Sequence, residues 1–131
     1  GKTAHAPGFY VHLSPDEVFF GGGVWMPEPD ALAKIRKAIA KDSKGWSKAI
    51  GGAAFTKLCG SVQGEKLARP PKGFAAEHPL IETLKHKSFF AMHESSSKAM
   101  QGKEVLDKVE AVFTASKPMM AFLCKAVGAP F

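Results

Sequence analysis

Residues 9–25 alternate between apolar and polar or small side chains on both sides of a short polar loop at 14–17. This two-residue alternation predicts an antiparallel hairpin in which Leu13 pairs with Val18. Because successive side chains of a strand point to opposite faces, we expect one apolar core face and one polar-aromatic face. The expected core face comprises Phe9, Val11, Leu13, Val18 and Phe20, and the opposite face comprises Tyr10, His12, Phe19, Gly21, Gly23 and Trp25.

Three consecutive glycines, Gly21 to Gly23, interrupt the second half of this pattern. Glycine loses much conformational entropy in a strand and contributes no side chain to packing, so a run of three needs a compensating cause. The sequence leaves two causes open. Either the glycines lower the floor of the polar-aromatic face so that a ligand can approach the backbone, or a helix or Trp25 packs directly onto them.

Beyond the hairpin the apolar positions mostly recur at helical spacing. Pro29 and Asp30 stand at a helix start, and the following segment 31–41 places its apolar residues on one stripe among lysines. Further helices are expected as two short segments within 46–59, over 79–87, and from 103 to 127 with a kink or break at Pro118. Residues 88–93 alternate like a strand.

The order of these elements predicts a single α+β domain over residues 1–131. Its sheet is expected to be short and antiparallel, formed by the glycine-rich hairpin and the strand near 88–93, and to pack against several α-helices. The function that follows depends on the polar-aromatic face of the hairpin. That face must be open to solvent, because a helix sealed over it would leave no site.

The charge balance favours a polyanionic partner. The 131 residues carry 18 Lys and Arg against 12 Asp and Glu, which gives a net charge of +6. Such an excess is typical of proteins that bind nucleic acid or anionic surfaces. No apolar stretch approaches the ~20 residues of a membrane-spanning helix, and the first residues lack a signal-peptide pattern. No membrane partner is therefore expected, the location is cytoplasmic or undetermined, and the oligomeric state stays open.

The sequence offers little material for a metal or cofactor site. Cys59 and Cys124 stand far apart in apolar surroundings, so two buried free thiols are expected, and a single disulfide stays open. His12 and His93 can lie on neighbouring strands, but no H-x-x-x-H or Cys/His pair supplies local ligands. The glycine run lacks the Lys and Ser or Thr of a phosphate-binding loop, and no G-x-S-x-G motif is present. No metal and no cofactor are expected.

Five short motifs carry a family resemblance. They are GFYVHLSP at 8–15, GGGVWMPEP at 21–29, RPPKGF at 69–74, HPLIE at 78–82 and KSF at 87–89. In this order, and over nearly the whole chain, they resemble the domain-of-unknown-function family 2461. That family occurs in bacteria and fungi and has no assigned activity. Its full-length members have an additional N-terminal half, so the resemblance implies that this chain is a processed C-terminal part of a longer protein.

Cleavage of RNA makes the smallest chemical demands on the residues present. A base takes the proton of the ribose 2′-hydroxyl, an acid protonates the leaving oxygen, and a fixed cation holds the charge that grows on phosphorus. His and Glu can perform both proton transfers without a metal. In size, charge and residue classes the chain resembles small basic fungal ribonucleases and ribotoxin-like proteins. This resemblance implies a metal-independent ribonuclease acting on RNA, with the ribosome as a candidate partner.

The candidate site combines the polar-aromatic face with the stiff cationic loop RPPKG at 69–73. We expect His12 to be the base or the acid and either Glu28 or His78 to be its partner. The cations and rings complete the set: Arg69 and Lys72 as phosphate contacts, and Tyr10 and Trp25 as a base-stacking platform.

Two other functions remain open. The chain can be a non-catalytic nucleic-acid or anion-binding module that uses the same face and the lysine-rich helix at 34–41. It can also be a structural fragment of a larger protein without a site of its own. Each candidate residue has an ordinary structural role as well: His12 as a hydrogen-bonded strand residue, His78 as a helix cap, and Tyr10 and Trp25 as cover for the sheet.

Overall fold

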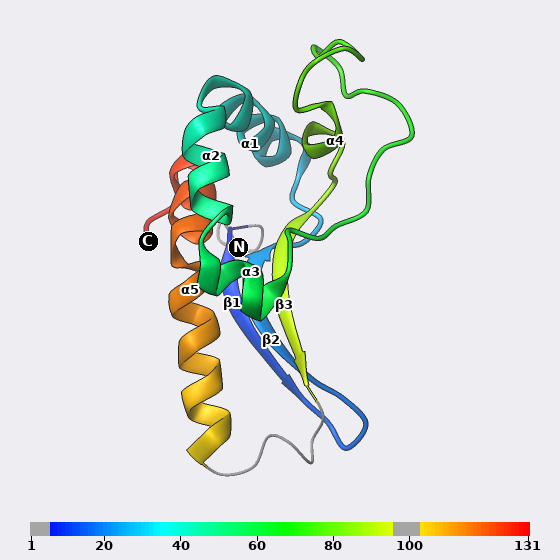
Figure 1. Ribbon diagram of the computed structural model, residues 1–131. Helices are drawn as coiled ribbons and strands as arrows, with labels where there is room; N and C mark the ends of the chain where they lie inside the picture. Colours follow the sequence, from blue (N-terminus) through cyan, green and yellow to red (C-terminus); the bar gives the residue numbers. More distant parts are fainter. Residues whose placement is uncertain (1–5, 96–102) are drawn as a thin grey trace.

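The computed structural model describes residues 6–95 and 103–131 (Figure 1). The elements are β1 (Gly8–Leu13), β2 (Val18–Val24), α1 (Pro29–Lys41), α2 (Ser43–Ile50), α3 (Ala53–Cys59), α4 (Ile81–Leu84), β3 (Phe89–Ser95) and α5 (Lys103–Val127). The strands form one three-stranded antiparallel sheet in the order β1-β2-β3. The α+β class is therefore confirmed, and so is the third strand, which begins one residue later and ends two residues later than predicted.

The hairpin has the predicted register. Leu13 pairs with Val18, and the loop between them is closed by Ser14, whose backbone N–H donates to the Glu17 carbonyl at 2.9 Å. The Glu17 N–H in turn donates to Ser14 Oγ at 3.1 Å. This register fixes the two faces of the sheet, because directly paired residues share a face.

The inner face of the sheet carries the core and is covered by helices. Phe20, Phe89 and Ala91 are fully buried on it, α5 packs against β2, and α3 packs against β3. Figure 1 shows α5 running along one side of the sheet, with α1 and α2 above it. The imidazole of His93 belongs to this face, since its Nδ1 donates to the Leu58 carbonyl at 2.7 Å.

Two residues expected in the core are not buried. Val11 and Leu13 point to the inner face as predicted, but they are 46% and 61% exposed. The reason is the reach of the hairpin: its tip extends away from α1 and α2, alongside the N-terminal half of α5 (Figure 1). The buried residues of α5 begin only at Val112, so the tip lies outside the well-packed core.

The structure supplies a cause for the glycine run. A Cβ atom on Gly21 would lie 1.9 Å from the Ala91 carbonyl oxygen, and one on Gly23 would lie 2.2 Å from the Phe89 carbonyl oxygen. Gly22 faces the core, where a Cβ would meet the Met120 sulfur at 3.0 Å. The run is therefore required by the close approach of the β3 backbone and by α5 packing, and no ligand is needed to explain it.

The helical predictions hold in part. Pro29 is the first residue of α1, as predicted. Gly51 and Gly52 separate α2 from α3. The helix expected at 79–87 is shorter in the structure and comprises only α4. The residues after α4 are not helical because they pair with residues 65–67, where the Lys87 N–H donates to the Glu65 carbonyl at 2.7 Å. No break occurs at Pro118, which lies inside the continuous α5.

Arg36 ties α1 to the segment that leads into β3. Its Nε donates to the Leu84 carbonyl at 2.7 Å, and its Nη2 donates to the His86 carbonyl at 3.0 Å. Burial lowers the pKa of Arg36. The guanidinium is thus engaged by backbone carbonyls, and its role is structural.

Candidate functional site

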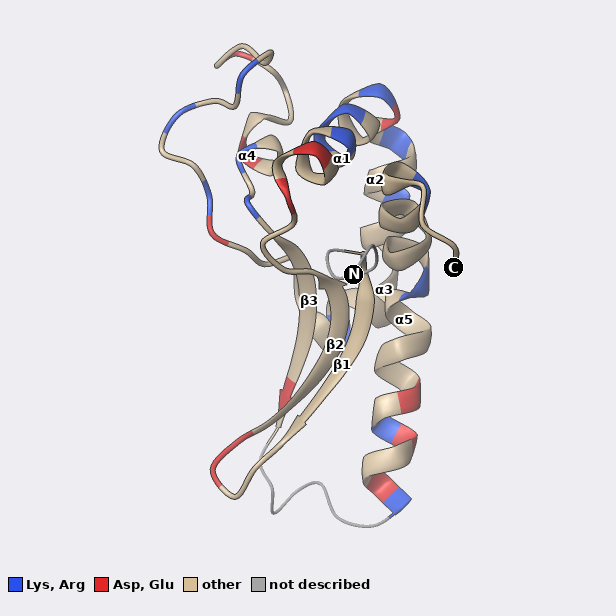
Figure 2. Ribbon diagram, turned by 180° about the vertical axis from the view of Figure 1, so that it is seen from behind, with Lys and Arg blue, Asp and Glu red and all other residues tan. Residues whose placement is uncertain are grey.

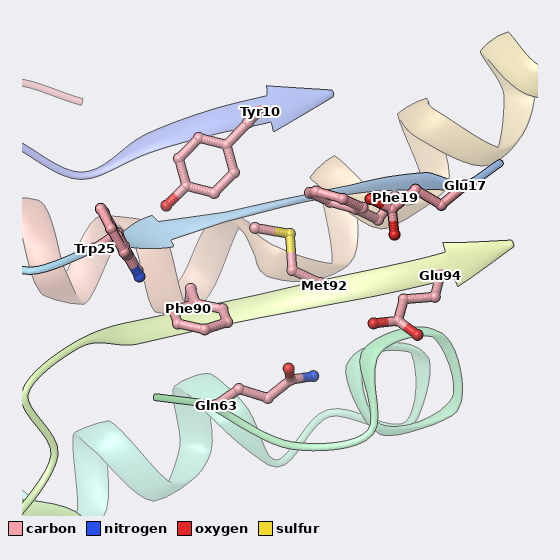
Figure 3. Close-up of a pocket in the computed structure, with 8 residues that line it drawn as sticks. All are labelled: Tyr10, Glu17, Phe19, Trp25, Gln63, Phe90, Met92 and Glu94. Atoms are coloured by element: carbon pink, nitrogen blue, oxygen red, sulfur yellow. The ribbon is translucent and has the colours of Figure 1, made fainter. Parts of the chain in front are cut away.

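The outer face of the sheet is open in the described part of the chain and holds a pocket of about 490 Å³ (Figure 3). Figure 2 shows this face from the front, with no labelled helix drawn over the strands. The lining residues are Tyr10, Glu17, Phe19, Trp25, Gln63, Phe90, Met92 and Glu94. The surface on which the sequence placed the site is therefore available.

The pairing of the strands assembles the pocket in rows across the sheet. Gly21 pairs with Tyr10 of β1 on one side and with Met92 of β3 on the other. Because Gly21 has no side chain, only its backbone lies between the phenol of Tyr10 and the thioether of Met92. Trp25 follows β2 directly and is 70% exposed. Gln63 reaches the pocket from the free edge of β3, where its backbone exchanges two hydrogen bonds with Phe90, of 2.7 and 3.1 Å.

The Tyr10 hydroxyl is an unusual polar group in this pocket. Its oxygen is buried and has no hydrogen-bond partner in the described part of the chain. Burial also raises the pKa of Tyr10, because the phenolate would lose its hydration. Figure 3 shows the hydroxyl turned toward the end of the pocket where Trp25 and Phe90 lie. Because the oxygen has almost no solvent-accessible surface, a bound group can exchange a hydrogen bond with it only after a neighbouring side chain moves aside, and that bond would then remove a cost of about 1–3 kcal/mol.

The opposite end of the pocket is acidic. Glu17 and Glu94 both lie there (Figure 3). His12, on the same face, has its Nε2 3.7 Å from the Glu17 carboxylate, and the two side chains are 45% and 65% exposed. The imidazole stacks on Phe19 with ring centroids 4.6 Å apart. A solvent-accessible acid–base pair thus stands beside an aromatic pocket.

The structure brings together only part of the predicted site. Tyr10 and Trp25 line the pocket, and His12 lies on the same face of the sheet. The other four residues are absent from the pocket lining among the described residues: Glu28, Arg69, Lys72 and His78. The sequence could not place them relative to the sheet, since Arg69, Lys72 and His78 all lie in the long connection between α3 and α4, which runs away from the sheet (Figure 1).

Each of those residues occupies a different setting. Glu28 directly precedes α1 at its N-cap position. Arg69 and Lys72 lie in the loop between α3 and α4, which projects from the body of the protein (Figure 1). The Leu80 N–H donates to His78 Nδ1 at 3.0 Å, but α4 begins only at Ile81, with Leu80 at its N-cap position and no side-chain cap, so His78 holds the turn ahead of the helix.

Several pocket residues were missed from the sequence. Phe90, Met92 and Glu94 alternate with the inner-face residues of β3. The strand predicted at 88–93 already implied that Phe90 and Met92 share a face, whereas Glu94 lies just beyond that predicted strand. Glu17 was assigned only to the hairpin turn, although the turn brings it back to His12. Gln63 carries no periodic signal, because it joins the sheet through an isolated bridge.

Metal and thiol chemistry gain no support from the described residues. Within residues 6–95 and 103–131, no group of three or more His, Cys, Asp and Glu side chains could hold a metal ion. Cys59 and Cys124 are free and buried, as the sequence predicted. Burial raises the pKa of both thiols and thereby disfavours the reactive thiolate.

Comparison with known proteins gives one match. The model of the family described as "Conserved hypothetical protein (DUF2461)" matches residues 1–122. No curated protein and no solved structure matches the chain. The resemblance to ribotoxin-like ribonucleases thus finds no support from relatives. Among the described helices, none is both long and apolar enough to cross a membrane.

Proposed function

The chain belongs to the DUF2461 family, and we propose that it binds RNA by taking an unpaired nucleobase into the outer-face pocket and cleaves the adjoining phosphodiester with the His12–Glu17 pair. One observation carries the proposal. An open pocket with aromatic walls has, at one end, a buried hydroxyl without a hydrogen-bond partner among the described residues, and the His12–Glu17 pair stands beside its other end.

The pocket suits a base better than a phosphate. Unpaired RNA bases stack on aromatic side chains and form hydrogen bonds along their edges. Tyr10, Trp25 and Phe90 supply the rings, while the carboxylate of Glu94 and the amide of Gln63 can accept hydrogen bonds from exocyclic amino groups. The Glu94 carboxylate would repel a phosphate placed inside the pocket. The base therefore enters the pocket, and the backbone stays outside.

The reaction follows from the pair at the acidic end. One member of the pair takes the proton of the 2′-hydroxyl, whose oxygen attacks phosphorus and forms the O2′–P bond as the P–O5′ bond breaks. The other member gives a proton to the departing O5′, which leaves a 2′,3′-cyclic phosphate and a free 5′-hydroxyl. Glu17 replaces Glu28 and His78 as the proposed partner of His12, because its carboxylate lies 3.7 Å from the imidazole. Arg69 and Lys72 are left to contact a more distant part of the RNA.

The test measures cleavage and binding separately. Ribosomes and a structured RNA are incubated in excess chelator with wild type, His12→Ala, Glu17→Gln and the control Glu110→Gln, which changes an exposed carboxylate on α5. We expect discrete fragments from wild type and the control, and loss of about 10²-fold or more for the other two. Fragments of equal yield from His12→Ala would refute the assignment of the pair.

A non-catalytic base-binding module is the second candidate, since the pocket supports binding independently of the pair. In that case no variant yields fragments, yet Trp25→Ala weakens RNA binding because a stacking ring is lost. Stacking on one aromatic side chain is worth about 1–3 kcal/mol per base, which predicts a loss of roughly fivefold or more. Unchanged affinity in Trp25→Ala would refute the use of this pocket for RNA.

A further inference from the structure

A second concave surface, which we call the lysine groove, lies between α1 and the C-terminal part of α5 and has a volume of about 620 Å³. Its lining comprises Lys34, Lys37, Ala38, Lys41, Asp42, Phe122, Lys125 and Ala126. All four lysines are exposed. None of them forms an ion pair within the described part of the chain, whereas Lys66, Lys85 and Lys87 all do.

The acidic residue in the groove does not neutralise it. Asp42 is the N-cap of α2, and its Oδ1 accepts a hydrogen bond from the Gly45 N–H at 3.1 Å. The carboxylate is thus held by a helix end, while the four ammonium groups around it stay unmatched. Figure 2 shows several blue segments gathered on α1, at the end of the molecule away from the hairpin tip.

Helix stability alone does not account for this arrangement. Lys34, Lys37 and Lys41 follow one another at three and four residues, so like charges are neighbours on one face of α1, which is unfavourable for the helix. Lys41 and Lys125 gain something from the negative helix ends, because each lies in a last turn. Lys34 and Lys37 gain nothing of the kind.

We propose that the lysine groove binds the phosphate backbone of RNA, at a distance from the base-binding pocket. The proposal rests on the proposed function for the identity of the polyanion. Lys41 follows Lys34 by seven positions, which is roughly 10 Å along the helix, so the ammonium groups form a row that can follow successive phosphates.

A linear polyanion fits the groove better than a membrane surface. The apolar stripe of α1 is turned away, since Ile35 and Ile39 are fully buried in the core, and Phe122 in the groove is half-buried. No exposed apolar side chain of the groove is therefore available to enter a bilayer. A concave row of charges matches a strand of phosphates.

The two sites lie on different sides of the sheet. The pocket occupies the outer face, whereas α5, which forms one wall of the groove, packs on the inner face. A short oligonucleotide can fill only one of them. A folded RNA that extends around the domain can occupy both, so the groove favours long structured RNA as the ligand.

The experiment compares two triple variants with equal changes in net charge. The groove variant is Lys34→Gln, Lys37→Gln and Lys41→Gln; the control is Lys57→Gln, Lys103→Gln and Lys117→Gln, all exposed and outside the groove. Affinity for a structured RNA is measured from 50 to 300 mM salt. Each phosphate contact contributes about 0.7–0.9 to the slope of log K against log salt. The three replacements in the groove should therefore reduce the magnitude of this slope by about 2–3, and the control replacements should reduce it much less.

The result is independent of catalysis. A protein that binds RNA with a groove-dependent salt slope but never cuts it supports the groove and refutes the ribonuclease proposal. Equal slopes for the groove variant and wild type, in folded protein with an unchanged circular dichroism spectrum, would overturn the groove. So would tighter binding of wild type to phosphatidylserine vesicles than to RNA, because the occupant would then be a lipid surface.

Discussion

The replacement Tyr10→Phe should change stability and ligand binding in opposite directions. The change removes one oxygen and leaves the ring in place. That oxygen is buried and has no hydrogen-bond partner in the described part of the chain. An unsatisfied buried hydroxyl costs about 1–3 kcal/mol, so its removal should raise the free energy of unfolding. We expect a gain of about 1 kcal/mol, at the low end, because the side chain as a whole is only half-buried.

Chemical and thermal unfolding measure the stability. For a domain of this size, 1 kcal/mol corresponds to a rise in melting temperature of about 4 °C. In the same variant, RNA affinity should fall about two- to tenfold, because the bound base loses one hydrogen bond. Tyr10→Leu serves as the matched control. It removes the ring as well, so it should lower both stability and affinity.

Two results would refute this reasoning about Tyr10. A loss of stability in Tyr10→Phe would mean that the hydroxyl is satisfied in the folded protein. Unchanged or tighter RNA binding would mean that no ligand group reaches it. Tyr10 is the only tyrosine in the chain, so its absorbance can be titrated directly, and its pKa should lie above the usual 10.0 because of burial.

Three further predictions concern the scaffold of the site. Burial lowers the pKa of His86 below its usual 6.5. As the pH drops, the unfolded chain therefore binds a proton at this histidine before the folded protein does, and the free energy of unfolding should fall below about pH 6.5. Urea unfolding at pH 7.5 and 5.5 measures this change. Gly21→Ala should cost about 2–3 kcal/mol, because the new Cβ meets the Ala91 carbonyl, whereas Gly52→Ala, with open space around it, should cost less than about 1. Arg36→Ala should cost about 2–3 kcal/mol, since two backbone carbonyls lose a charged donor.

Each of these has a clear contrary outcome. A His86→Gln variant with the same loss of stability between pH 7.5 and 5.5 as wild type would assign the proton uptake to another group. Equal costs for the two glycine replacements would show that β3 can move away from β2. Full stability in Arg36→Lys would show that the fork of two hydrogen bonds is dispensable, because a lysine cannot reproduce it.

The part of the candidate site that lies on the hairpin was predictable from the alternation of side chains along its strands. Tyr10, His12 and Trp25 were placed on a common face by the two-residue period, and the structure keeps them there. The partner of His12 was not predictable in this way. Glu17 comes back to His12 through the closure of the hairpin loop. The position of Glu28 and His78 relative to the sheet depends on how distant segments pack, which a local pattern does not reveal.

The sequence by itself determined the local structure of this protein: the hairpin with its register, the start of α1, the third strand and the long final helix. These follow from periods of two and 3.6 residues and from proline and glycine positions, which act within a few residues of each other. Only the tertiary structure decided the rest. The glycines are required by the backbone of β3 and by α5, the lysines of α1 gather with Lys125 of α5, and the outer face stays open because the described helices pack on the inner one. Such features depend on contacts between segments far apart in the chain, and no local period carries information about them.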